Sequence, residues 1–197
     1  MFPRGLPPIG IGIDICQIHR VRKILASPVK ATKFAQRILS PEELSMPVTS
    51  RILKCVFTPS ETSTRIEDPT ARKAADFMAG RFAAKEAVIK AYSRRRLTFH
   101  DIVVTYQNEL STPFENETLK SSRREQASAS ASEGQPDERS SASPPVAIIK
   151  GDGIYGQVYA RLSISHDGDY ATAMCLTMLE DPGYRDGAGD PTTGLVT

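Results

Sequence analysis

Tryptophan is absent from this 197-residue sequence, cysteine occurs only three times, and no hydrophobic run is long enough to cross a membrane. The cysteines at positions 16, 55 and 175 form neither a CxxC pair nor a zinc-ligand pattern, which argues against a disulfide scaffold and a structural zinc site. Two of them lie in apolar segments, where a free thiol behaves as a small hydrophobic side chain. We therefore expect a protein of a reducing, intracellular compartment.

A large excess of one charge is also missing, because 25 Lys and Arg are nearly balanced by 23 Asp and Glu, for a formal net charge of +2. This charge is too small to predict nucleic-acid binding, and the arginine cluster at 94–96 lacks the interleaved aromatic residues that stack on bases. There is no P-loop, and Gly10-Ile11-Gly12 lies inside an expected strand, which excludes a dinucleotide-binding turn there. We expect neither nucleic acid nor a membrane as a partner. Because a core strand is expected from residue 9, we also expect no cleavable presequence.

Residues 9–16 alternate strictly between isoleucine and a second set of residues that are small or polar. A period of two predicts a half-buried strand. We expect the isoleucine face to lie in the core and the face with Gly10 and Gly12 to be bare enough for another group to approach the backbone. Asp14 would stand at the end of that bare face, either as an ordinary strand-end aspartate or as a ligand.

Residues 70–92 form the strongest predicted helix, rich in alanine and interrupted only by Gly80. Helical spacing places Glu86 and Lys90 on one side, next to small alanines, which favours a surface groove beside Glu86. Taken alone, this pair is an ordinary i, i+4 surface pair that stabilises the helix by roughly 0.2–0.5 kcal/mol.

The remaining segments predict one α+β domain at residues 9–179. Residues 18–38 are expected to be helical with a break near Ser27-Pro28, and Ser40-Pro41-Glu42-Glu43 predicts a capping box at a helix start. Further strands are expected within 97–106, 146–149, 161–166 and 170–179, while residues 51–57 are apolar and of undecided type. Residues 115–145 are rich in Ser, Glu and Arg and predict a disordered insertion, and residues 181–197 predict a flexible tail.

Three distant segments carry side chains suited to a metal and a phosphate. Asp14 and Glu86 can supply the carboxylate pair that Mg²⁺ takes alongside water and substrate phosphates. Arg81 and Lys90 can hold phosphate oxygens, and His166 can bind a further phosphate. Each residue also has an ordinary structural interpretation, so the hypothesis requires the fold to bring them into one cleft.

These segments resemble the 4′-phosphopantetheinyl transferase family, in its holo-acyl carrier protein synthase branch. The most specific similarity is Gly-Arg-Phe-Ala-Ala-Lys-Glu-Ala at 80–87 followed by Lys90, which resembles the family's signature helix. Gly-Ile-Gly-Ile-Asp at 10–14 resembles its opening strand, and Ser-Ile-Ser-His at 163–166 resembles its closing hairpin. The resemblance covers roughly residues 9–108 and 146–179.

The resemblance implies a mostly antiparallel sheet wrapped around a central helix, and a homotrimer with the coenzyme A site between subunits. It implies that Asp14 and Glu86 bind Mg²⁺ and that Arg20 helps to receive an acidic apo acyl carrier protein. It also implies four contacts to coenzyme A: Arg81, Lys90, Ser165 and His166. The implied reaction transfers the phosphopantetheine arm of coenzyme A to a serine of the carrier protein and releases 3′,5′-ADP. Glu86 would accept the serine proton and Lys90 would stabilise the leaving phosphate.

Two departures distinguish this chain from the family pattern. Ser93-Arg94-Arg95-Arg96 stands where many members have a Gly-rich turn near the coenzyme A phosphates, so arginines would replace the backbone cradle. The Ser-rich insertion is unusual for the compact bacterial type and indicates a eukaryotic, fungal-like member. Such a member would work in the mitochondrial matrix or the cytosol.

Two other functions stay open. A non-catalytic module that binds coenzyme A or a nucleotide would keep the basic residues but would not need the Asp14–Glu86 pair. A metal-dependent phosphohydrolase would need a positioned water and further carboxylates, for which Asp167 and Asp169 are the obvious candidates.

Overall fold

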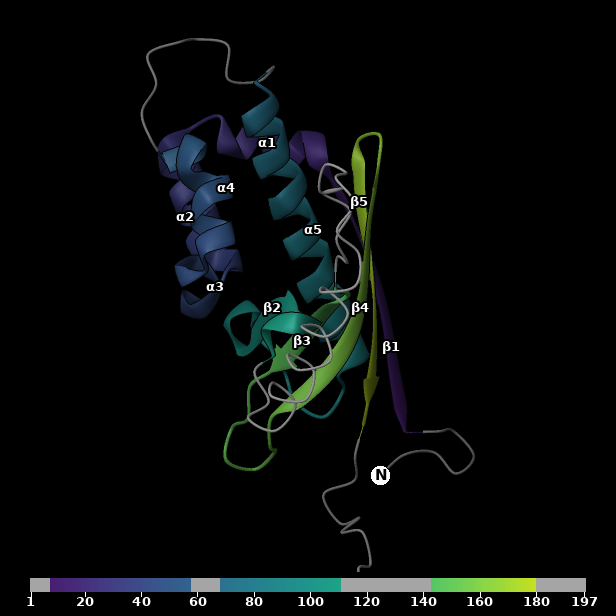
Figure 1. Cartoon of the computed structure of the whole chain (residues 1–197). Helices are drawn as coiled ribbons and strands as arrows, with labels where there is room; N and C mark the ends of the chain where they lie inside the picture. The colour runs from purple at the N-terminus through teal and green to yellow at the C-terminus, as the bar shows by residue number, and fades with distance from the viewer. Residues whose placement is uncertain (1–7, 58–67, 111–142, 180–197) are drawn as a thin grey trace, which may run out of the picture.

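The computed structural model describes residues 8–57, 68–110 and 143–179, in which a five-stranded antiparallel sheet packs against one long helix (Figure 1). The strand order is β1-β5-β4-β3-β2, so β1 is one edge of the sheet. The helices and strands are β1 (Ile9–Gln17), α1 (Ile18–Leu25), α2 (Pro28–Ile38), α3 (Pro41–Ser45), α4 (Pro47–Phe57), α5 (Pro69–Ala91), β2 (Ile102–Tyr106), β3 (Pro145–Ile149), β4 (Val158–Asp167) and β5 (Tyr170–Met178), with short 3₁₀ turns at Phe99–Asp101 and Gln107–Glu109. The predicted α+β class and antiparallel sheet are confirmed.

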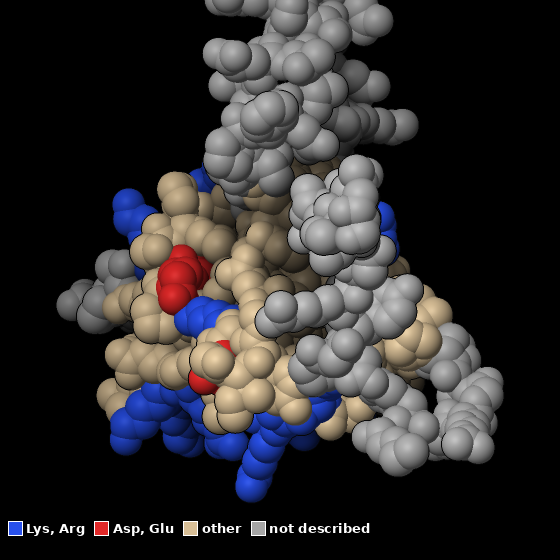
Figure 2. All heavy atoms as spheres, turned by 90° about the horizontal axis from the view of Figure 1, so that it is seen from below, with Lys and Arg blue, Asp and Glu red and all other residues tan. Residues whose placement is uncertain are grey.

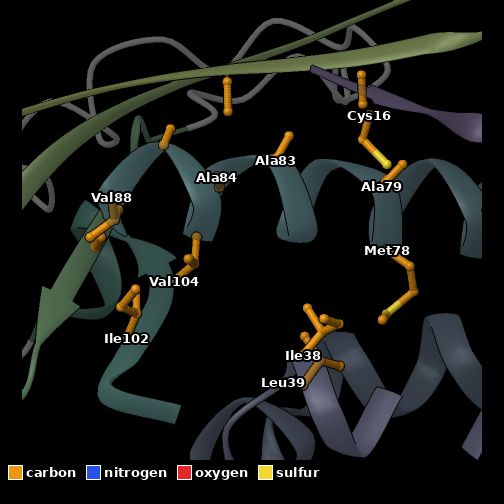
Figure 3. Packing of buried hydrophobic residues seen from close by; sticks show 14 of the residues in the cluster. Cys16, Ile38, Leu39, Met78, Ala79, Ala83, Ala84, Val88, Ile102 and Val104 are labelled. Atoms are coloured by element: carbon orange, nitrogen blue, oxygen red, sulfur yellow. The ribbon is translucent and has the colours of Figure 1, made fainter. Parts of the chain in front are cut away.

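Helix α5 is the centre of the domain. It begins where Pro69 follows Asp68, whose side chain accepts a hydrogen bond from the Thr70 N–H at 2.8 Å. One side of α5 packs on β1, β4 and β5, and the other side packs on α1 and α4. In Figure 3, Met78 points toward Ile38 and Leu39, whereas Ala79 and Ala83 face the sheet. The expected central helix is therefore confirmed.

The expected burial of the isoleucine face of β1 is wrong. Ile11, Ile13 and Ile15 are 67%, 64% and 64% exposed, whereas Gly10 and Gly12 are buried. The glycine face packs directly on α5 instead. An alternating pattern shows that a strand has two unlike faces, but it does not show which of them meets the rest of the chain.

The seam between β1 and α5 is built from small residues. A Cβ added to Gly12 would lie 2.0 Å from the Ala87 carbonyl oxygen, so no larger side chain fits there. Ala83 and Ala87 are fully buried in α5. The groove expected beside Glu86 is thus replaced on this side by close packing of backbone against backbone. This packing brings β1, with Asp14, against the last turns of α5.

The face of the sheet that points away from α5 exposes a continuous apolar strip. Strand pairing sets β1 isoleucines beside apolar residues of β5, as in Ile11↔Leu176 and Ile13↔Met174. We call this strip the outer apolar face; it comprises Ile9, Ile11, Ile13, Ile15, Met174, Leu176 and Met178, all at least 39% exposed. Contiguous exposed apolar surface of this kind marks an interaction site.

Several local predictions are confirmed. Ser40 and Glu43 form the predicted capping box at the start of α3, and the helical region 18–38 breaks before Pro28. Gly168, at φ +53°, lies in the two-residue turn that joins β4 to β5. Residues 51–57, whose type the sequence left undecided, belong to helix α4. The predicted tail and the predicted insertion lie outside the described residues, except for residues 143–145, where β3 begins.

Candidate functional site

Two of the predicted site residues form an ion pair at the free edge of β1. The Lys90 Nζ lies 2.7 Å from Asp14 Oδ1 and 3.0 Å from the Ile13 carbonyl oxygen. The Asp14 side chain is 16% exposed and the Lys90 side chain 50% exposed. These residues are 76 positions apart in the sequence, so the fold brings them together as the hypothesis requires.

Glu86 lies one helical turn before Lys90 and directly precedes Ala87, the residue against which Gly12 packs. Its side chain is partly exposed and forms no hydrogen bond or ion pair with other residues of the described ranges. Strand β1 therefore passes beside the turn that carries Glu86. We call Asp14, Glu86 and Lys90 the edge cluster.

The donor set of the edge cluster suits a hard cation. Within the described part of the chain, no group of three or more His, Cys, Asp and Glu side chains lies together. Two carboxylates are enough for Mg²⁺, which usually keeps several waters and takes further oxygens from substrate phosphates. The ammonium of Lys90 beside Asp14 shows that this carboxylate is placed to hold a positive charge.

Arg20 lies near the same end of β1, in the first turn of α1. Burial raises the pKa of the Cys16 thiol, and the Arg20 guanidinium beside the thiol acts against this rise. The charge of Asp14 also acts on Cys16. Arg20 is exposed, so a partner that binds there would lie close to the edge cluster.

Arg81 and His166 line a separate cavity of about 270 Å³, which we call the Arg81 pocket. The His166 Nε2 lies 2.9 Å from the Asp76 carbonyl oxygen. Arg81 is only 6% exposed. The other lining residues are Phe77, Gly80, Tyr106, Ser143, Pro144, Pro145 and Ile164. A buried cation beside a histidine gives this cavity the chemistry of an anion site.

The edge cluster and the Arg81 pocket lie on different sides of α5. Arg81 and Glu86 are five residues apart, which places them about 140° apart around a helix. In the sheet, β5 separates Asp14 on β1 from His166 on β4. Within one copy of the described chain, Arg81 and His166 therefore form one group, and Asp14, Glu86 and Lys90 form another.

Ser165 belongs to neither group. Strand register aligns Ser165 with Thr172 and Thr172 with Ile15, so Ser165 shares the face of the sheet that carries Ile15. Its neighbour His166 points the other way, toward α5, where it contacts the Asp76 carbonyl. Ser165 is exposed and does not line the Arg81 pocket.

The arginines after α5 are largely engaged within the fold. Arg94 donates a hydrogen bond to the Leu179 carbonyl at 2.7 Å, and Arg95 donates one to the Lys150 carbonyl at 2.7 Å. Arg95 also pairs with Asp152 at 3.2 Å. These contacts link the segment that follows α5 to Leu179, Lys150 and Asp152. They favour a structural role for Arg94 and Arg95 over the binding of a phosphate. Figure 2 views the molecule from below and shows Lys and Arg side chains gathered along one rim.

The sequence interpretation missed a buried ion pair between Lys85 and Glu43. Both side chains are almost completely buried, at 0% and 1% exposed. The ammonium also donates to the carbonyls of Ile38 at 2.7 Å and Phe99 at 2.9 Å. Burial lowers the pKa of Lys85, and the Glu43 carboxylate opposes this shift. The available signal was the position of Lys85 on the same side of the helix as Met78.

Residues 10–147 match the family model of the 4′-phosphopantetheinyl transferase superfamily. Over 99 residues the chain is 40% identical to a holo-[acyl-carrier-protein] synthase of Geobacillus kaustophilus (strain HTA426), with 49% of this chain and 60% of the relative covered. It is 38% identical over 96 residues to a holo-[acyl-carrier-protein] synthase of Bacillus velezensis (strain DSM 23117 / BGSC 10A6 / LMG 26770 / FZB42), with 47% and 61% covered. The match thus spans less than two thirds of these relatives.

Among solved structures, the holo-ACP-synthase from Plasmodium yoelii aligns with a TM-score of 0.47 and 22% identity, over 87% of this chain and 95% of that chain. In the described ranges, no helix has the length and apolar character to cross a membrane. The match to the family model extends over well more than half of the sequence. This chain therefore belongs to the 4′-phosphopantetheinyl transferase superfamily.

Proposed function

We propose that this protein transfers the 4′-phosphopantetheine arm of coenzyme A to a serine of an apo acyl carrier protein, in an Mg²⁺-dependent reaction that releases 3′,5′-ADP. The observation that carries the proposal is the edge cluster, in which β1 places Asp14 beside Lys90. Lys90 lies one helical turn after Glu86 on α5. The names of the curated relatives, holo-[acyl-carrier-protein] synthase, support the same reaction. A module that only binds a nucleotide has no need for this carboxylate pair.

The residues of the edge cluster have distinct roles in this reaction. The serine oxygen bonds to the β-phosphorus while the bond from that phosphorus to the oxygen of the departing 3′,5′-ADP breaks. Glu86, whose side chain has no partner in the described ranges, accepts the serine proton. Lys90 is half exposed, so its ammonium can turn from Asp14 to the phosphate oxygen that gains charge. Asp14 and Glu86 would hold Mg²⁺, which supplies charge neutralisation at the pyrophosphate.

The proposed active site is shared between two copies of this chain, and the proposed assembly is a homotrimer. The edge cluster lies on one side of α5 and the Arg81 pocket on another, so the proposal places coenzyme A between two copies, in contact with the edge cluster of one and the Arg81 pocket of the other. The outer apolar face adjoins the edge cluster along β1 and supplies surface for that contact. In this arrangement, Arg81 and His166 of one copy bind a phosphate of the coenzyme A that reacts at the edge cluster of the next. Ser165, which shares the outer face, would contact coenzyme A only from that interface.

Arg20 is proposed to receive the carrier protein. It is exposed on α1 and lies beside Cys16, near the edge cluster, where an acidic protein would present its serine. The proposed place of action is the mitochondrial matrix or the cytosol. In the described residues none of Cys16, Cys55 and Cys175 forms a disulfide, which is consistent with a reducing compartment.

The test is intact-mass spectrometry of an apo acyl carrier protein incubated with this chain, coenzyme A and Mg²⁺. The expected result is a mass gain of one phosphopantetheine arm, which disappears when EDTA removes the metal. No gain across several carrier proteins, with coenzyme A binding intact, would contradict the proposal and favour a binding module.

A further inference from the structure

Arg81 carries a positive charge into a place that solvent hardly reaches. Arg81 is 6% exposed as a residue, and it lines the Arg81 pocket beside His166. A Cβ placed on Gly80 would lie 3.0 Å from His166 Nε2, so the two basic groups form adjacent walls of the cavity. An arginine has a long and flexible side chain, and its guanidinium binds a phosphate well only if it is held in a suitable orientation.

Two aromatic rings from different elements contact this guanidinium. Its central carbon lies 4.9 Å from the centre of the Phe77 ring and 6.0 Å from the centre of the Tyr106 ring. Phe77 precedes Arg81 by one helical turn on α5, whereas Tyr106 is the last residue of β2. The face of an aromatic ring attracts a cation, and both distances fall within the range of this interaction.

We propose that Tyr106 and Phe77 are positioning residues that hold the guanidinium of Arg81 for a phosphate of coenzyme A. A cation–π contact restrains a guanidinium through the face of the ring and uses none of its N–H groups as donors. Those N–H groups are the donors that bind a phosphate with two parallel hydrogen bonds. This inference rests on the proposed function, because coenzyme A supplies the phosphate.

Tyr106 is the better residue to test, because it comes from β2 and is not part of the helix that carries Arg81. The probe is 3′,5′-ADP, titrated calorimetrically into the full chain without metal or carrier protein, so that binding is measured apart from chemistry. Tyr106→Leu keeps apolar volume but removes the ring, and the expected rise in Kd is about 2- to 30-fold. Tyr106→Phe keeps the ring face and is expected to bind within about twofold of the wild type.

Steady-state kinetics give a second measurement. Tyr106→Leu should raise the KM for coenzyme A while leaving kcat and the KM for the carrier protein nearly unchanged, because the ring acts on binding. The matched control is Phe34→Leu, which removes a partly buried ring from α2, away from the Arg81 pocket. If Phe34→Leu weakens 3′,5′-ADP binding as much as Tyr106→Leu does, the effect is general loss of stability and the inference is wrong.

The outcomes separate this inference from the proposed function. Equal Kd values for the wild type and Tyr106→Leu would overturn the positioning role while leaving the transferase proposal intact. A Tyr106→Phe variant as weak as Tyr106→Leu would also overturn it, because the hydroxyl and not the ring would then matter. Absence of any binding of 3′,5′-ADP and coenzyme A by the wild type would overturn the proposed function and this inference together.

Discussion

Helix α5 carries two lysine–carboxylate pairs five residues apart, and the two pairs differ in almost every physical respect. Lys85 is paired with Glu43 at 0% and 1% exposure, and two backbone carbonyls accept its remaining hydrogen bonds. Lys90 is paired with Asp14 at 50% and 16% exposure. The first pair has every donor satisfied in the interior, whereas the second lies at the sheet edge within reach of solvent.

The comparison separates a structural pair from a functional one. Breaking a buried pair leaves a charge without solvation, so neither Lys85 nor Glu43 can leave the other for a new partner without a large cost in stability. An exposed pair contributes little to stability, so Lys90 can leave Asp14 for a phosphate at small cost. Position on the helix thus decides which lysine links α5 to α2 and α3 and which one is available for chemistry.

The largest expected effect comes from Lys85→Met. This change removes the ammonium from Glu43 and from the carbonyls of Ile38 and Phe99, so the free energy of unfolding should fall by about 3–5 kcal/mol. Urea denaturation followed by circular dichroism measures it. The matched control is Lys90→Met, the same chemical change one and a half turns later, which should cost less than about 1 kcal/mol. Equal losses in both variants would remove the distinction between the pairs.

A smaller loss of stability is expected from Gly12→Ala. The new Cβ would lie 2.0 Å from the Ala87 carbonyl oxygen, so β1 must move away from α5 at a cost of about 1–3 kcal/mol. The movement would also carry Asp14 away from Lys90 and Glu86, which should weaken Mn²⁺ binding measured by electron paramagnetic resonance. Gly156→Ala is the control, because its Cβ meets nothing within 4 Å. Unchanged stability of Gly12→Ala would show that the seam is looser than the structure indicates.

The sequence could predict β1 as a strand but not which of its faces is buried. The isoleucines look like core residues, yet the glycines fit more closely against the small residues of α5, as the 2.0 Å approach at Gly12 shows. Similarly, Lys85 lies within a recognised motif, but its partner Glu43 is 42 residues away and its pairing depends on how α3 packs. Periodicity and capping are local properties and were predicted well, whereas pairings between elements depend on the assembled fold.

The division of the candidate site was also beyond the sequence. The motif residues Arg81, Glu86 and Lys90 lie close together in the chain, which makes a single cleft the natural expectation. Helical geometry instead directs Arg81 to one side of α5 and Glu86 to another, and the register of the sheet places His166 with Arg81. Tyr106 had no sequence signal at all, because its role depends on where β2 ends.

Substitutions in the exposed Lys90–Asp14 pair should have a large effect on activity and only a small effect on stability. Asp14→Asn and Lys90→Met should each change the free energy of unfolding by less than about 1 kcal/mol. Both should abolish phosphopantetheine transfer. Their Mn²⁺ affinities in the absence of coenzyme A should differ in direction: Asp14→Asn loses a ligand and weakens binding, while Lys90→Met removes a competing cation and strengthens it. Weaker metal binding in Lys90→Met would contradict the exchange of partners proposed for Asp14.

The smallest expected effect belongs to a third pair, Glu42 with Lys150, which is exposed and lies outside the candidate site. The Lys150 Nζ donates to Glu42 Oε1 at 2.7 Å, and this hydrogen bond is the main cause that lowers the pKa of Glu42 from 4.5 to about 2. Glu42 is 52% exposed, so solvent screening keeps the expected loss in Glu42→Gln at pH 7 below about 1 kcal/mol.

The lowered pKa of Glu42 also predicts how its contribution to stability changes with pH. Because the folded-state pKa of Glu42 is lowered, its contribution is complete above the unfolded value of 4.5 and disappears as the pH falls toward about 2. The stability of the wild type and of Glu42→Gln should therefore converge across that interval in urea titrations at stepped pH. Asp101 and Asp152, whose pKa values are also lowered, titrate equally in both proteins and cancel in the difference. If the difference in stability between the wild type and Glu42→Gln stays constant down to pH 2, Glu42 acts through packing and not through its charge, unlike the ion pairs on α5.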